Sequence, residues 1–207
     1  MRLFDQLFGQ VLPDIADERL LLRLPRADDY PQWRDLRAES RAFLAPWEPA
    51  WSGDELSRPA YRARLKRYRQ EAVERSGYTF FLFDAKGDTL LGGATVGQIR
   101  RGVAQSCTLG YWMGERYAGR GLMRGAVELI KPFVFEVERL HRIEAACLPT
   151  NARSIALLQR CGFRYEGHLR KYLKIDGRWE DHNLYALLAE DGGARPTPGR
   201  LHSAAAG

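Results

Sequence analysis

A short segment near the middle of the chain, residues 109–123, restricts the possible folds more than any other stretch. It reads LGYWMGERYAGRGLM. A strand-like run ends at Met113, a loop carries Gly119 and Gly121, and apolar residues at helical spacing follow. The first N–H groups of a helix are unpaired and partly positive, and glycine lets a ligand approach the backbone. The segment therefore predicts a strand, a loop and a helix whose N-terminus can bind phosphate.

Two better-known phosphate loops do not fit this segment. The dinucleotide fingerprint needs a small residue three positions after the second glycine, and Arg124 occupies that position. The loop of phosphate-binding NTPases needs Gly-Lys-Ser/Thr, which does not follow Gly121. A plain turn between a strand and a helix stays open as the alternative.

Composition indicates an ordered protein with an ordinary hydrophobic core. The 207 residues suit a single domain, and 45% of them are hydrophobic. Lys and Arg outnumber Asp and Glu by 32 to 26, a formal net charge of +6. This balance favours anionic ligands or ribonucleoprotein partners, but a simple basic surface explains it equally well.

Cysteine usage and the N-terminus bear on the cellular compartment. Cys107, Cys147 and Cys161 are widely spaced and show no metal-ligand pattern, so we expect reduced thiols and no bound metal. Asp5 interrupts the short apolar run at the N-terminus, which predicts neither a signal peptide nor a membrane span. A cytoplasmic location is expected.

Periodicity and turn residues predict a mixed α/β (α+β) single domain. Strands are expected at 20–24, 78–83, 89–99, 105–113, 142–147, 165–175 and 178–188, and helices at 28–43, 54–75, 122–138 and after Asn151. Pro132 should kink its helix, Asn151 should cap the next one, and Asp176-Gly177 predicts a type I′ hairpin turn. Residues 1–18 form a lead-in, 19–190 the domain, and 191–207 a tail expected to be disordered.

Several motifs together resemble one enzyme family. Arg116, Gly119 and Gly121 match the Arg-x-x-Gly-x-Gly pyrophosphate loop of the GCN5-related N-acetyltransferases (GNAT). Further matches to its ribosomal-protein-alanine N-acetyltransferase (Rim-type) group are residues 43–49 (FLAPWEP), 119–123 (GRGLM), 141–143 (HRI), 151–154 (NARS) and 175–182 (IDGRWEDH). The resemblance implies a mixed, mostly antiparallel sheet that is splayed at the cofactor site and flanked by helices. It also implies acetyl-CoA as co-substrate and no metal.

The resemblance indicates the cofactor-binding residues, and the chemistry of acetyl transfer indicates the catalytic candidates. The cofactor-binding set is Tyr111, Trp112, Met113, Arg116, Ala118, Gly119, Arg120, Gly121, Leu122, Met123, Asn151 and Ser154. The catalytic candidates are Glu48, as base or counter-charge, Ser154, near the thiol, and Tyr172; Asp181 and His182 are weaker candidates. Some group members carry an acidic base at the start of the last hairpin, but here residues 169–172 read LRKY, without a carboxylate.

Acid–base chemistry favours one class of acceptor. An α-amine has a pKa near 7.8 and a lysine amine near 10.4, so a lysine costs about 3 kcal/mol more to deprotonate at neutral pH. A site without an evident base is therefore better suited to a protein N-terminus.

We accordingly expect acetylation of an alanine-starting ribosomal protein, with the ribosome as a further partner. A small amine such as a polyamine or an aminoglycoside is the alternative acceptor. A non-catalytic RNA- or ribosome-binding module is a third hypothesis. No membrane or DNA partner is expected, and both a monomer and a homodimer fit the sequence. The arginine-rich helix at 54–75 is interpreted as a solvated face.

Overall fold

An eight-stranded sheet forms the centre of the computed structural model, which describes residues 14–191. The predictions for residues 1–13 and 192–207 lie outside the described residues. The strands are β1 (Ile15–Ala16), β2 (Leu20–Arg23), β3 (Tyr78–Asp84), β4 (Leu90–Arg100), β5 (Ser106–Met113), β6 (Arg142–Cys147), β7 (Arg164–Ile175) and β8 (Arg178–Leu188). The α-helices are α1 (Tyr30–Glu39), α2 (Arg41–Leu44), α3 (Arg58–Val73), α4 (Leu122–Pro132) and α5 (Ala152–Arg160).

The sheet is mixed, as the sequence predicts. Its order is β1-β2-β3-β4-β5-β6-β8-β7, and only the β5–β6 pair is parallel. All the predicted strands form. The short strand β1 was not predicted: it lies inside the expected lead-in and pairs with β2, Ile15 opposite Leu22.

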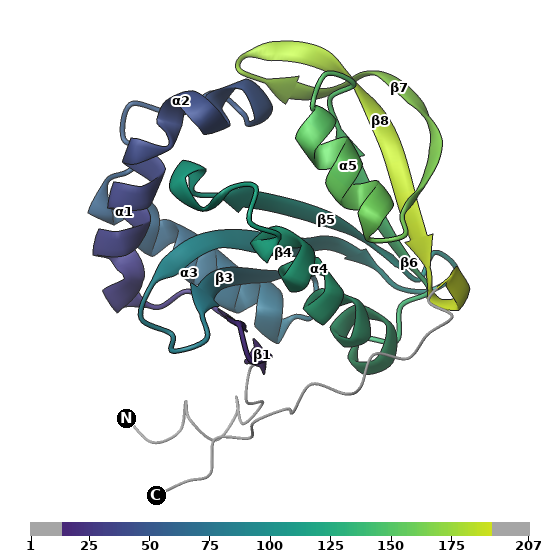
Figure 1. The fold of residues 1–207 in the computed structure, drawn as a ribbon, viewed down its shortest axis with the longest axis horizontal. Coiled ribbons are helices and arrows are strands. Elements are labelled where there is room, and N and C mark those ends of the chain that lie inside the picture. Colours follow the sequence, from purple (N-terminus) through teal and green to yellow (C-terminus); the bar gives the residue numbers. More distant parts are fainter. Residues whose placement is uncertain (1–13, 192–207) are drawn as a thin grey trace, which may run out of the picture.

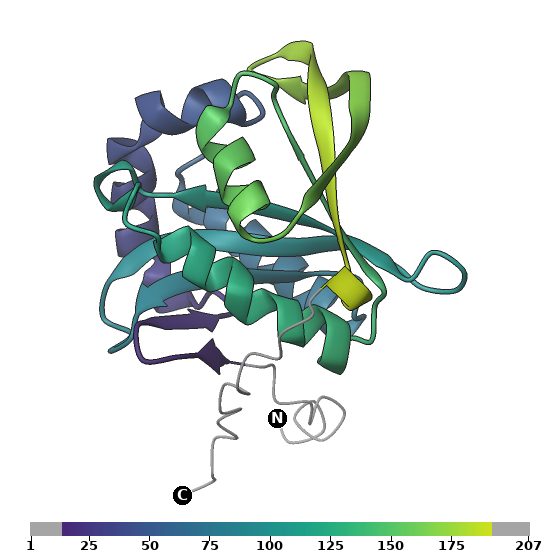
Figure 2. The ribbon, with the colours of Figure 1, turned by 45° about the vertical axis from the view of Figure 1, so that its right-hand side comes forward.

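Helices cover both faces of the sheet, so that two hydrophobic cores form. In Figure 1, α4 and α5 lie in front of the sheet and α3 lies behind it. The larger core includes Ile130 of α4 and Leu158 of α5, and the smaller core includes Trp33 of α1 and Tyr61 of α3. Turning the molecule shows α4 and α5 lying along the same face (Figure 2).

Two predicted helices differ from the structure at their ends. The predicted helix at 54–75 begins only at Arg58, because the Ser57 side chain caps it by accepting from Ala60 N (3.2 Å) and Pro59 occupies its first turn. The predicted helix at 28–43 is interrupted at Ser40, where α1 ends and the short α2 begins.

Pro132 changes the helix register instead of simply kinking the helix. A proline has no N–H to donate to the carbonyl four residues earlier. The α-helical bonding of α4 accordingly ends at Pro132, and residues Phe133–Val137 continue as a π-helical turn. Glu138 N donates to Phe133 O at 2.9 Å, a bond that spans five residues.

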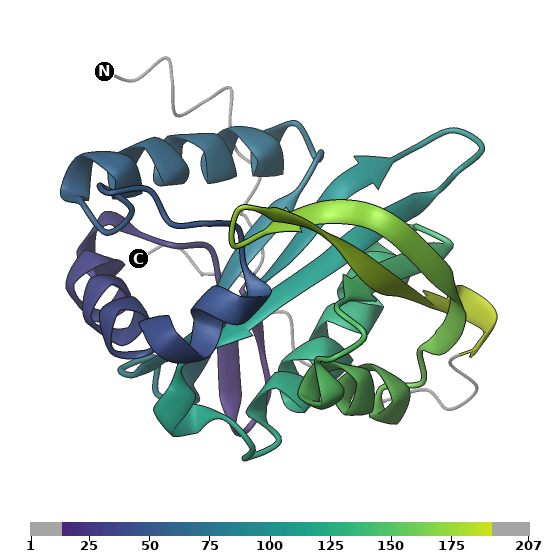
Figure 3. The ribbon, with the colours of Figure 1, turned by 90° about the horizontal axis from the view of Figure 1, so that it is seen from above.

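The last two strands form a hairpin that reaches across the sheet. Asp176 and Gly177 both have positive φ (44° and 79°), as the predicted type I′ turn requires. Seen from above, this hairpin extends toward the segment that follows α2 (Figure 3). Asp176 N donates to Glu48 O at 2.9 Å, so the hairpin tip is tied to that segment.

A buried carboxylate holds the far end of the α4 segment. Glu138 is only 3% exposed and accepts from Tyr78 Oη at 2.7 Å. Arg75, after α3, and Arg101, in the β4–β5 loop, also donate to it, at 3.2 and 2.5 Å. One side chain thus joins four segments.

We predict that Glu138→Ala destabilises the protein by about 2 kcal/mol, because the buried Tyr78 hydroxyl loses its partner while the two half-exposed arginines regain water. Thermal or urea unfolding measures this. Glu136→Ala is the matched control, since Glu136 is exposed and lies in the π-helical turn that ends just before Glu138. Equal losses in the two variants would contradict the role given to Glu138.

Candidate active site

The two parallel strands separate halfway along β5. They pair only at Ser106↔Arg142, Cys107↔Ile143 and Thr108↔Glu144. Beyond Thr108, β5 continues to Met113 paired with β4, and β6 bends away. Within the described residues, one edge of 109–113 therefore has no strand beside it. An extended ligand with amide groups can bind that edge.

The glycine loop ends at the N-terminus of α4, as predicted. Gly119 and Gly121 have φ of 77° and 75°, a region that favours glycine. A Cβ at either position would meet open space. The first backbone bond of α4 runs from Gly125 N to Gly121 O at 3.1 Å, so the N–H groups of residues 122–124 have no acceptor within the helix. This geometry suits a pyrophosphate group.

Two arginines, Arg116 and Arg120, lie in or beside this loop and contact neighbouring side chains. Arg116 forms an exposed ion pair with Glu39 (3.3 Å) and stacks on Tyr117 at 5.0 Å. Arg120 lies 5.9 Å from the centre of the same ring. Ala118 N already donates to Glu115 O, so the predicted contact of Ala118 with a ligand cannot use its N–H.

Residues Tyr111 and Ser154 meet where the strands separate. Asn151 caps α5, as predicted, by accepting from Ser154 N at 3.1 Å. This cap places the Ser154 hydroxyl 2.5 Å from the Tyr111 hydroxyl on β5. Burial raises the pKa of Tyr111 above its ordinary value, so it stays protonated. Burial also raises the pKa of Cys147 at the end of β6, although a hydrogen bond with Ser154 opposes the shift.

A pocket of about 430 Å³ opens on the other face of β5. Its walls come from α1, the segment after α2, α3 and strands β3 to β5. They include Trp33, Arg37, Glu48, Trp51, Glu55, Arg64, Tyr68, Phe81, Tyr111 and Trp112. As predicted, neighbouring residues of β5 face opposite ways: Tyr111 packs on the larger core and Trp112 on the smaller one. Tyr111 is also among the lining residues of this pocket, so the residue that contacts Ser154 at the gap borders the pocket as well.

Both carboxylates in the pocket wall are ion-paired. Glu48 accepts two hydrogen bonds from Arg37, each 2.7 Å, and a third from Trp51 Nε1 at 3.0 Å. The Arg37 guanidinium lies 4.5 Å from the Trp51 ring and 5.1 Å from the Trp112 ring. Glu55 pairs with Arg64 at 2.5 Å. An arginine therefore neutralises each of these carboxylates in the pocket wall.

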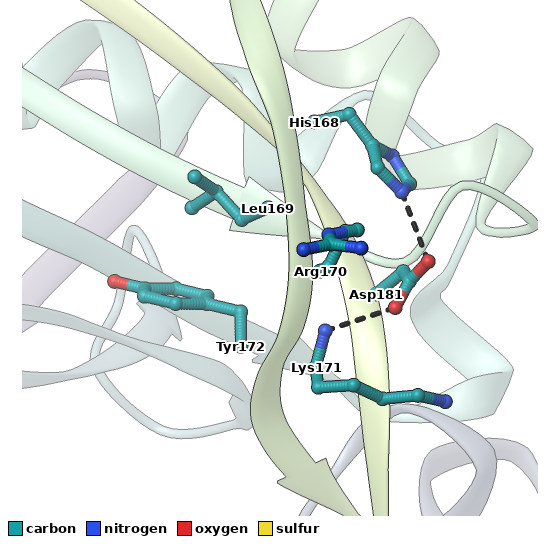
Figure 4. A pocket seen from close by; sticks show the side chains of 6 residues that line it. All are labelled: His168, Leu169, Arg170, Lys171, Tyr172 and Asp181. Atoms are coloured by element: carbon teal, nitrogen blue, oxygen red, sulfur yellow. Dashed lines mark hydrogen bonds and ion pairs between the residues drawn. The ribbon is translucent and has the colours of Figure 1, made fainter.

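A larger, wide-open hollow of about 650 Å³ lies on the β7–β8 hairpin (Figure 4). Strand β7 bulges between Leu169 and Leu173, the stretch that lacks the acidic residue carried there by some members of the group. Asp181 fills the bulge by accepting from Lys171 N (2.9 Å) and pairing with His168 (2.9 Å), which raises the pKa of His168. The hollow shares no lining residue with the pocket beside Tyr111.

The candidate catalytic residues thus fall into two groups. Glu48 lines the pocket that reaches Tyr111, and Tyr111 contacts Ser154. Tyr172 points away from the His168–Asp181 pair in Figure 4 and packs on the buried His182, with the ring centres 5.8 Å apart. Neither ring is among the residues that line the pocket beside Tyr111.

Sequence reasoning missed the partners of Glu48. Arg37 lies one helical turn after Trp33, and this spacing indicates that both residues lie on the inner face of α1. Nothing in the sequence indicates that Arg37 contacts Glu48, eleven positions later.

Residues 14–191 contain no group of three or more His, Cys, Asp or Glu residues that could hold a metal ion. No helix in this range has the length and apolar character needed to cross a bilayer. The three cysteines are buried and unpaired, as predicted.

Comparison with known proteins identifies a common architecture. Residues 19–164 match the family model described as an acetyltransferase (GNAT) domain. The chain is 37% identical over 186 residues to the [ribosomal protein uS5]-alanine N-acetyltransferase of Escherichia coli (strain K12), covering 90% of this chain and 94% of that protein.

Solved structures agree with this match. The ribosomal-protein-S5-alanine acetyltransferase of Vibrio fischeri superposes with a TM-score of 0.79 at 30% identity, covering 88% of this chain and 99% of the other. RimJ of Mycobacterium smegmatis, in complex with CoA-disulfide, gives 0.79 at 32% identity, with coverage of 86% and 87%.

We predict that Gly121→Ala lowers the affinity for coenzyme A on the order of tenfold, a loss of about 1.4 kcal/mol, because a methyl group then occupies the space in front of the α4 N-terminus. Calorimetry measures the affinity. Gly102→Ala is the matched control: Gly102 also has positive φ (66°) and open space at its Cβ, but lies in the β4–β5 loop. Each variant should lose about 1–2 kcal/mol of stability. If the two variants bind coenzyme A with equal affinity, the loop is only a turn that leads into α4 and does not bind the cofactor.

Proposed function

This chain belongs to the GNAT acetyltransferase family and is an acetyl-CoA-dependent N-acetyltransferase, and we propose that it acetylates the N-terminal α-amine of an alanine-starting ribosomal protein. The name of the Escherichia coli relative, at 37% identity, supports a ribosomal acceptor. The finer choice of an N-terminal alanine rests on the sequence motifs and on the chemistry of the pocket.

One observation carries the choice of an α-amine. Among the described residues that line the pocket, the only carboxylates are Glu48 and Glu55, and both are held in ion pairs. A pocket of this kind offers little help in removing a proton. An α-amine, with its pKa near 7.8, is substantially neutral at pH 7 to 8 without such help, whereas a lysine or polyamine amine is not.

We assign cofactor binding and acceptor binding to opposite sides of β5. The N–H groups at the start of α4, with Arg120 beside them, suit the pyrophosphate, and the free edge of 109–113 suits the pantetheine arm. When bound, acetyl-CoA supplies an acetyl group activated as a thioester. The acceptor amine enters from the opposite face, through the pocket lined by Trp51 and Trp112. The two substrates thus meet beside Tyr111 in an orientation fixed before reaction.

The transfer itself needs only modest assistance. The amine nitrogen forms a bond to the acetyl carbon, the bond from that carbon to sulfur breaks, and sulfur leaves with the electron pair. The extra proton on nitrogen passes to water in the open pocket. We assign Ser154, at the gap between the strands, to hydrogen-bond the departing sulfur.

Acetylation assays at several pH values test the acceptor class. For a lysine-free peptide that starts with alanine, kcat/KM should rise with pH and level off near about 8. The same peptide with a blocked N-terminus and one internal lysine should react far more slowly, and so should spermidine. A profile that still climbs past about 9, or a preference for spermidine, would assign a different amine. Failure to bind coenzyme A would leave the RNA- or ribosome-binding module as the better reading.

We predict that Glu48→Gln raises the peptide KM and lowers the melting temperature while kcat falls by no more than about threefold, because Glu48 holds Arg37 and Trp51 in the pocket wall. Steady-state kinetics and thermal unfolding measure this. Glu55→Gln, at the other paired carboxylate, is the comparison. A loss of kcat by about two orders of magnitude in Glu48→Gln alone would instead identify Glu48 as the general base.

A further inference from the structure

The contact between Tyr111 and Ser154 is unusual in its setting. The two hydroxyl oxygens are 2.5 Å apart, a short distance for a hydrogen bond between neutral groups. They come from different elements, β5 and α5, on the two sides of the gap where β5 and β6 separate. Ser154 is 9% exposed, and its backbone is fixed by the Asn151 cap. The sequence assigns Tyr111 only a contact with the cofactor.

Each hydroxyl has a single proton, so the direction of this bond decides what Ser154 can do. If Ser154 donates to Tyr111, its proton is occupied. If Tyr111 donates to Ser154, the Ser154 proton is left for another acceptor, either the neighbouring Cys147 sulfur or a bound ligand. Burial keeps Tyr111 protonated, and a phenol is a stronger donor than an alcohol. The second arrangement is therefore favoured.

We propose that Tyr111 is a positioning residue for the leaving group: its hydroxyl donates to Ser154 Oγ and so directs the Ser154 O–H toward the coenzyme A sulfur. This inference rests on the proposed function. As the carbon–sulfur bond breaks, the electron pair and its charge go to sulfur, and the Ser154 O–H hydrogen-bonds to it. Both hydroxyls keep their protons, and the thiolate takes its proton later from water. The Tyr111 bond strengthens the Ser154 donor because linked hydrogen bonds polarise one another.

The same pair has a consequence for free coenzyme A. A donor aimed at the sulfur favours the thiolate over the thiol, so affinity should increase as the thiol ionises. A coenzyme A whose sulfur carries a methyl group cannot ionise and should show no such increase. The difference between these two ligands isolates the hydroxyl pair from any general loss of structure.

The experiment compares the wild type, Tyr111→Phe and Ser154→Ala by calorimetry with coenzyme A and its S-methyl thioether, between about pH 6 and 10, on either side of the ordinary thiol pKa near 8.5. The wild type should gain affinity for coenzyme A relative to the thioether as pH rises, and both variants should lose most of that gain. Their kcat with acetyl-CoA and an alanine-starting peptide should fall on the order of tenfold, with the KM for acetyl-CoA within about twofold of the wild type.

Tyr61→Phe is the matched control, because it also removes one buried tyrosine hydroxyl, here donating to Arg26 O at 2.8 Å, away from the pocket lining. It should keep both the pH-dependent gain and kcat. Should Tyr111→Phe fail to fold, a Ser154→Ala variant that keeps the gain in full still overturns the inference, because Tyr111 can act on the sulfur only through Ser154. If a wild type that binds coenzyme A shows no gain, or if Tyr111→Phe keeps it in full, the inference is wrong and the proposed function stands. A wild type that binds neither ligand overturns both.

Discussion

The parting of β5 from β6 is the constraint on which the rest of this structure depends. Parallel strands normally satisfy one another along their whole length, yet here pairing stops at Thr108↔Glu144. The edge that is left free needs other partners, because unpaired backbone groups away from water are costly. The separation also lets Tyr111 meet Ser154 across the gap. A single change in strand pairing thus creates the edge to which we assign the pantetheine arm of the cofactor.

Two rigid supports keep that gap in place. On one face, the larger core packs α4 and α5 against the sheet, and Glu138 ties the far end of the α4 segment to β3 and to the β4–β5 loop. On the other face, Arg37 is stacked between two tryptophans and fixed by Glu48. The opposite charges of Arg37 and Glu48 largely cancel. The pair therefore contributes mainly to the shape of the proposed acceptor pocket and little to its electrostatic potential.

This division explains how the site can work without a free base. Ion-paired carboxylates give a stable, well-defined wall, but they are poor proton acceptors. An acceptor that is already substantially neutral near pH 8 makes that weakness unimportant. The demanding part of the reaction then shifts to the leaving group, where two linked hydroxyls lie in a largely buried site. Hydrogen bonds aimed at developing charge are strongest in such a place.

The sequence by itself determined the order of the strands and main helices and the glycine loop that leads into α4. Alternating and helical periodicity identified the strands and the helix after Gly121. The turn at Asp176-Gly177 and the cap at Asn151 also formed as expected. All of these features depend on residues that are close in the chain. The sequence could not locate the ends of helices where Ser40 and Ser57 intervene, nor foresee the π-helical turn that absorbs Pro132. Above all, it could not pair Glu48 with Arg37, place Asp181 in the β7 bulge, or bring Tyr111 to Ser154, 43 positions apart. Those contacts exist only once the sheet has assembled, since they join elements whose relative positions are set by packing and not by local preference.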